Sequence, residues 1–140
     1  MARYAGWTPG QGPEPDRVRQ SREMFRRALR TGVVIACGSD VGVFAHGENA
    51  RELELMVEYG MTPAQALRAA TATAAQVLRR GDEMGRIAPG LRADLVAVRG
   101  DPLQDIAALR AVVWVVSGGR IMAGRAAEAP VLGAPRSASR

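Results

Sequence analysis

Apolar residues recur with a helical period in the first third of the chain. Over residues 16–30 they fall on one face of a helix, at Val18, Phe25, Ala28 and Leu29. Asp16 stands where an N-cap is expected, and Gly32 follows at a position where helices commonly end. We therefore predict a helix from Asp16 to about Arg30.

A second helical pattern begins at Asn49. Asn49 and Glu52 have the three-residue spacing of a capping pair at a helix start. The helix would turn three apolar side chains inward, namely Leu53, Met56 and Val57. Gly60 is then expected to end it.

The stretch "MTPAQALRAATATAAQVL" predicts one further helix. Thr62 is a candidate N-cap, Pro63 suits the first helical position, and Gln65 completes a capping box. One face would carry mostly small side chains, at Ala66, Leu67, Ala70, Ala74, Val77 and Leu78. Such a face suits close packing against another helix.

Between the first two helices, residues 33–38 read "VVIACG", an apolar run without polar alternation. This pattern is typical of a strand buried on both faces of a parallel sheet. A glycine-rich stretch, "SDVGVFAHGEN", follows directly and leads into the second helix.

The pattern changes to short β-prone segments over residues 81–124. The Pro89-Gly90 pair predicts a type II turn between two of them, and the Gly118-Gly119 pair predicts a hairpin between two more. Residues 1–15 are rich in Gly and Pro and predict an irregular lead-in, while residues 125–140 predict a flexible tail. The chain is therefore expected to run helix, strand, helix, helix and then four short strands.

Composition narrows the class of protein. The 140 residues suffice for one domain, and with 47% apolar but only 4% aromatic residues its core must be built from aliphatic side chains. The net charge is +5 and every basic residue is arginine, but the arginines are dispersed among acidic residues, which does not favour nucleic-acid binding. A single cysteine, no signal-peptide core and no apolar stretch of about 20 residues predict a cytoplasmic protein outside the membrane.

Asp40 is the main candidate for chemistry. A carboxylate at the carboxyl end of a buried parallel strand lies where α/β barrels carry their active sites, although a turn aspartate bonded to local backbone N–H groups fits the same position. His46, the only histidine, cannot form a metal site alone and fits an ordinary loop residue equally well. Cys37 fits a small buried side chain, and Ser39 lacks the frame of a nucleophilic serine.

Several motifs taken together are more informative. The strand end "GSD", the helix start "HGENARELE", then "GMTPAQALRAAT", "PG…ADLV" and "GDPL.DI" occur in order. Over residues 17–124 this series resembles the C-terminal end of metal-dependent amidohydrolases, nearest to imidazolonepropionase and the related cytoplasmic dipeptidases.

The resemblance implies an architecture and a site. Such enzymes are (β/α)8 TIM-like barrels, so residues 16–80 would be the last strand and helices of the barrel, and residues 81–124 strands of a small β-sandwich. Asp40 falls on the family's aspartate that binds metal and exchanges a proton with the attacking water. His46 falls in a loop that faces the substrate. The cofactor implied is one or two divalent ions, with zinc favoured.

The chain also departs from the family pattern. With one histidine and no lysine it cannot supply the family's other metal ligands. We therefore expect the C-terminal portion of an amidohydrolase that hydrolyses amide or cyclic amide C–N bonds of a small-molecule substrate, dipeptide or imidazolone-like. It would need the missing N-terminal barrel portion for activity, and a homo-oligomer remains open. The alternative is a non-catalytic remnant or assembly partner.

Overall fold

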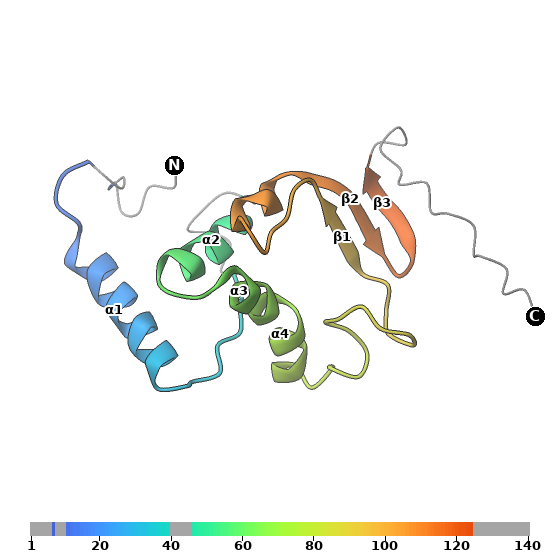
Figure 1. The fold of residues 1–140 in the computed structure, drawn as a ribbon, viewed down its shortest axis with the longest axis horizontal. Coiled ribbons are helices and arrows are strands. Elements are labelled where there is room, and N and C mark those ends of the chain that lie inside the picture. The colour runs from blue at the N-terminus through green and yellow to red at the C-terminus, as the bar shows by residue number, and fades with distance from the viewer. Residues whose placement is uncertain (1–6, 8–10, 40–45, 125–140) are drawn as a thin grey trace, which may run out of the picture.

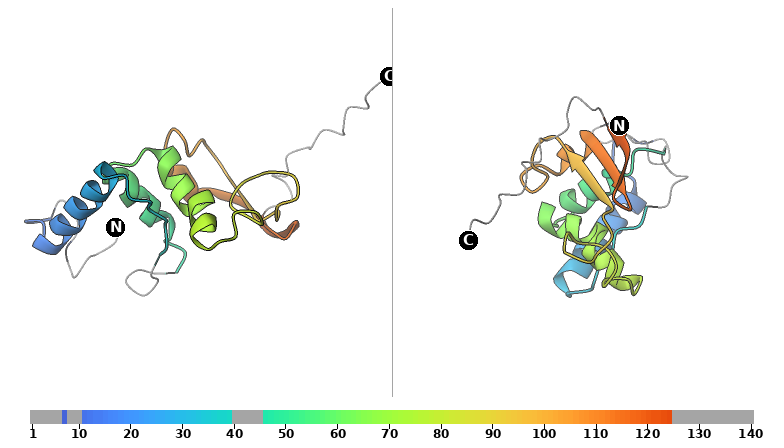
Figure 2. Two further views of the ribbon diagram at one scale, coloured as in Figure 1. Left: turned by 90° about the horizontal axis from the view of Figure 1, so that it is seen from below. Right: turned by 90° about the vertical axis from the view of Figure 1, so that its right-hand side faces the viewer.

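The computed structural model describes residues 7, 11–39 and 46–124. Its helices are α1 (Asp16–Arg30), α2 (Ala50–Glu58), α3 (Pro63–Ala70), α4 (Ala72–Val77) and the 3-10 helix η1 (Ile106–Arg110), and its strands are β1 (Leu95–Val98), β2 (Val112–Ser117) and β3 (Arg120–Gly124). The arrangement is elongated, with α1 at one end, α2 to α4 in the middle and the sheet at the other end (Figures 1 and 2). In the described part of the chain, none of the helices combines the length and the apolar character that crossing a membrane requires.

Helix α1 has the predicted bounds but a different start. Pro15, with an extended backbone, occupies the N-cap position, and no side chain caps the helix. The prediction of Asp16 as the cap is therefore wrong: it lies in the first turn, where its carboxylate accepts a hydrogen bond from Arg19 at 2.7 Å. Gly32 follows the helix with a φ of +71°, which confirms its predicted role at the end.

The segment after α1 does not form the predicted strand. Residues 33–39 have no strand partner in the described chain, and the side chains of Val33 and Val34 are 57% and 73% exposed. A strand exists only when a neighbour accepts and donates its backbone hydrogen bonds, and here the segment is held by a helix. The Cys37 N–H donates to the Ala69 carbonyl at 2.9 Å, which ties the segment to α3.

Helix α2 turns its apolar face inward as predicted. Met56 is 4% exposed, and Gly60 ends the helix with a φ of +124°. The predicted capping pair is wrong, because Asn49 adopts a helical backbone at the N-cap and its side chain makes no cap hydrogen bond. The Asn49 side-chain amide instead donates a hydrogen bond to the hydroxyl of Ser39, ten positions earlier.

The capping box of α3 is confirmed in both directions. The Gln65 N–H donates to the Thr62 hydroxyl at 3.2 Å, and the Thr62 N–H donates to the Gln65 side-chain oxygen at 2.8 Å. The prediction of one continuous helix is wrong, because the backbone breaks at Thr71 (φ −124°, ψ −93°) and α4 begins beyond it. The Thr71 hydroxyl donates to the Leu67 carbonyl at 2.7 Å, a local bond that competes with continued helix.

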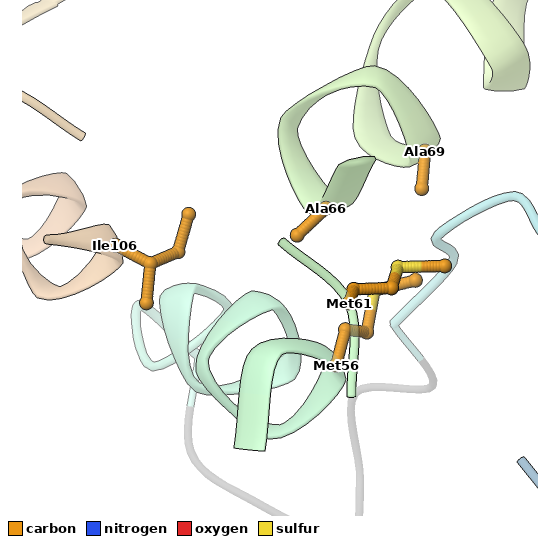
Figure 3. Packing of buried hydrophobic residues seen from close by; sticks show 5 residues of the cluster. All are labelled: Met56, Met61, Ala66, Ala69 and Ile106. Carbon is orange, nitrogen blue, oxygen red and sulfur yellow. The ribbon is translucent and has the colours of Figure 1, made fainter. Parts of the chain in front are cut away.

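The core lies where α2, α3 and η1 meet (Figure 3). It consists of five buried residues: Met56, Met61, Ala66, Ala69 and Ile106. Met56 and Met61 lie side by side, the two alanines belong to α3, and Ile106 enters from η1 (Figure 3). Small alanine side chains let the helices approach closely, and flexible methionines fill the remaining space.

The sheet is a three-stranded antiparallel meander in the order β1-β2-β3. The Gly118-Gly119 hairpin is confirmed, with both glycines at positive φ and Ser117 opposite Arg120. The Asp94 carboxylate accepts the Gly118 N–H at 2.7 Å and closes this turn. Four strands were expected but three form within residues 81–124, because the segment before the Pro89-Gly90 turn stays irregular.

Candidate functional site

Asp40, the predicted catalytic residue and metal ligand, lies outside the described residues. The structure shows the chain on both sides of it. The hydroxyl of Ser39 accepts a hydrogen bond from the Asn49 side-chain amide at 2.9 Å. The two ends of the stretch that carries Asp40 and His46 are therefore joined directly before α2. Sequence reasoning missed this contact because Asn49 had a plausible local role as a helix cap.

His46, the predicted substrate contact, lies in an exposed turn followed by Gly47 with a φ of +93°. It is three residues from Asn49 and two from Glu48, so the position of its backbone depends on how these two residues are held. Exposure leaves the imidazole accessible to a small molecule. Its role as a substrate contact stays a prediction.

Glu48 belongs to an ion-pair network that spans 62 residues of sequence. Arg110, at the end of η1, donates to the Glu48 carboxylate at 2.8 Å and to the Glu54 carboxylate at 3.1 Å. Glu54 also accepts from Arg51 at 3.2 Å. The hydrogen bond from Arg110 is the main cause that lowers the pKa of Glu54, so the pair is fully charged at neutral pH. No sequence periodicity indicates such a contact.

Cys37 and Glu52 are two further titratable groups, one before and one after the stretch of sequence that carries Asp40 and His46. Burial raises the pKa of the Cys37 thiol, and the negative charge of Glu52 raises it further. Burial also raises the pKa of the Glu52 carboxyl group. The thiol is therefore kept protonated, which agrees with the interpretation of Cys37 as a small packed side chain rather than a nucleophile.

A divalent metal needs about three protein ligands around an open position. Within residues 7, 11–39 and 46–124 no group of three or more His, Cys, Asp and Glu side chains has the geometry to hold one. These residues alone do not fit the metal centre that the resemblance implies.

Comparison with known proteins decides the family. Residues 14–122 match the Amidohydrolase family. The chain belongs to the amidohydrolase family. This match confirms the resemblance that the motifs indicated.

Among similar proteins, ochratoxinase from Aspergillus niger is 37% identical over 105 residues, covering 71% of this chain and 22% of that protein. Adenine deaminase 2 from Rhizobium etli is 52% identical over 68 residues, covering 49% of this chain and 10% of that protein. The crystal structure of a Xaa-Pro dipeptidase with methionine bound in its active site superposes with a TM-score of 0.73 at 42% identity, covering 76% of this chain and 26% of the other. The chain thus spans about a quarter or less of these three proteins.

Proposed function

We propose that the chain is the C-terminal portion of a metal-dependent amidohydrolase that hydrolyses amide or cyclic amide C–N bonds, in a dipeptide or an imidazolone-like substrate. The proposal is supported above all by the family match over residues 14–122, which includes the stretch that carries Asp40 and His46. Similar proteins named ochratoxinase and Xaa-Pro dipeptidase favour an amide bond as the target. The remaining barrel strands would come from a preceding N-terminal portion.

In this proposal Asp40 accepts a proton from the attacking water and delivers it to the leaving nitrogen. Asp40 would also be one ligand of the family's divalent metal, with zinc favoured, and the other ligands would come from outside the described residues. Such a metal, when bound, lowers the pKa of a coordinated water. His46 would contact the substrate.

The experiment uses the full chain joined, by fusion or by co-expression, to the N-terminal portion of a related amidohydrolase. Hydrolysis of a panel of Xaa-Pro dipeptides and N-acyl amino acids is measured. Asp40→Asn keeps the shape but removes the proton acceptor, so kcat should fall by about 100-fold or more with a smaller change in substrate affinity. His46→Ala should mainly raise KM.

Asp82→Asn is the matched control, because Asp82 is an exposed turn residue that loses the same charge. Its kinetics should equal those of the parent protein. Near-full turnover of the Asp40→Asn protein would show that Asp40 is only a turn residue and would refute the mechanism.

The second candidate is a non-catalytic remnant or assembly partner. It is favoured by one observation, the exposed apolar segment at Val33 and Val34, which lacks a neighbouring strand in the described chain. A chain that binds the N-terminal portion stably but produces no hydrolysis with any substrate of the panel would support this candidate over the enzyme.

A further inference from the structure

We propose that Arg110 is a positioning residue for the turn that carries His46, and that it acts through Glu48. The proposal rests on the proposed function, because it gives Arg110 a part in substrate binding. It links the C-terminal segment of the chain, which carries the sheet, to the substrate side of the barrel segment.

The first step is that Arg110 itself is fixed. It ends η1, whose first residue, Ile106, is buried in the core against α2 and α3. The Asp105 carboxylate caps η1 by accepting the Ala107 N–H at 3.0 Å. The start of η1 is thus fixed by packing and by a cap, and the backbone of Arg110 follows from it.

The second step is that Glu54 orients the Arg110 guanidinium, which in this orientation also contacts Glu48. Its Nε and Nη2 atoms both donate to the Glu54 carboxylate, the two-point geometry that orients an arginine best. Glu54 is partly buried on α2 and is also held by Arg51. The remaining nitrogen, Nη1, is thereby directed at Glu48, whose carboxylate it meets at 2.8 Å.

The third step is that the Glu48 backbone is bonded into the start of α2. The Arg51 N–H donates to the Glu48 carbonyl at 2.9 Å, and the Glu52 N–H donates to the Asn49 carbonyl at 3.1 Å. Holding the Glu48 side chain therefore restricts the turn at residues 46–49 from its C-terminal end. These two amide groups also provide a direct measurement of how often the turn opens.

Hydrogen exchange at the Arg51 and Glu52 amides tests the idea on the chain as it exists, without any activity. Glu48→Gln should speed exchange at both amides about two- to five-fold, the scale of an exposed ion pair. Raising the salt concentration should produce the same change in the parent chain, because salt screens exposed pairs. Arg80→Ala, which removes the local pair of Arg80 with Glu83 on a distant turn, should leave these amides unchanged.

A double-mutant cycle separates Arg110 from the helix dipole, since Glu48 also lies near the positive end of α2. Arg110→Met removes the guanidinium but keeps the apolar stem, and Glu54 retains Arg51 as a partner. In the Arg110→Met background, Glu48→Gln should have no further effect on exchange. An equal effect in both backgrounds would assign Glu48 to the dipole alone and overturn the proposal.

In the completed enzyme, Glu48→Gln should raise KM while kcat stays within about two-fold, and its effect should vanish in a His46→Ala background. A purely structural role would instead lower activity equally in both backgrounds. If the exchange cycle succeeds but KM does not respond, Arg110 holds the turn without serving substrate, and the proposal fails. Near-full turnover of the Asp40→Asn enzyme would refute the proposed function, while the exchange result would still decide whether Arg110 holds the turn.

Discussion

The helices α2 and α3, and the segment formed by α1 and residues 33–39, both carry apolar side chains that the sequence predicts to be covered, but these side chains end in different environments. Ala66 on α3 is fully buried and Met56 on α2 nearly so, whereas α1 has no buried residue and Val34 is 73% exposed. α2 and α3 pack against each other and against η1 within the described chain. The contrast teaches that an apolar pattern predicts the face to be covered, but not whether the covering partner is present.

The largest difference in stability between the two regions should appear when one methionine in each is replaced by alanine. Met56→Ala removes a buried side chain from the core and should lower the free energy of unfolding by about 2–5 kcal/mol. Met24→Ala removes the same atoms from α1, where Met24 is 70% exposed, and should cost less than about 0.5 kcal/mol. Urea unfolding followed by circular dichroism measures both. Equal losses would show that the Met24 side chain is packed in solution.

A smaller difference in stability is expected between variants at the start of α3 and at the start of α2. Thr62→Ala removes a capping hydroxyl that accepts the Gln65 N–H and should cost about 1 kcal/mol. Asn49→Ala removes no cap bond, only a hydrogen bond to Ser39 between exposed side chains, so its cost should be below that of Thr62→Ala. Thermal unfolding of the two variants would contradict the structure if Asn49→Ala were the more damaging.

The smallest change in stability is expected for a substitution in the exposed segment at Val33 and Val34, which should instead change self-association of the chain. Val33 and Val34 expose apolar surface on backbone that no described strand pairs, so we expect the chain made alone to self-associate. Val34→Thr should raise the monomer fraction in sedimentation velocity while changing the free energy of unfolding by less than about 0.5 kcal/mol. Val57→Thr, placed in the partly buried shell of the core, is the control that should cost stability instead. A parent chain that sediments as a clean monomer would contradict this expectation.

Local signals predicted those parts of the fold that depend on neighbours in sequence. The bounds of α1, its end at Gly32, the capping box of Thr62 and the Gly118-Gly119 hairpin all depend on residues within one turn of each other. The break at Thr71 was missed because no Gly or Pro marks it, and the hydroxyl bond to the Leu67 carbonyl becomes visible only in the structure.

The parts that depend on distant residues were not predicted. A strand at residues 33–38 requires a neighbouring strand, and its apolar composition alone does not supply one. The Ser39–Asn49 bond and the pairing of Arg110 with Glu48 join residues 10 and 62 positions apart. Of the candidate site, the motif series predicted the family, whereas the roles of Asp40 and His46 stay predictions.

The hydrogen bond between Ser39 and Asn49 has a consequence for how such proteins can diversify. It joins the entry and the exit of the intervening sequence, and Arg110 holds Glu48 separately, so both contacts made just before α2 involve residues outside 40–47. Residues 40–47 can then be treated as a replaceable cassette. Exchanging them with the matching stretch of another amidohydrolase would change the chemistry offered to a substrate while both contacts are kept.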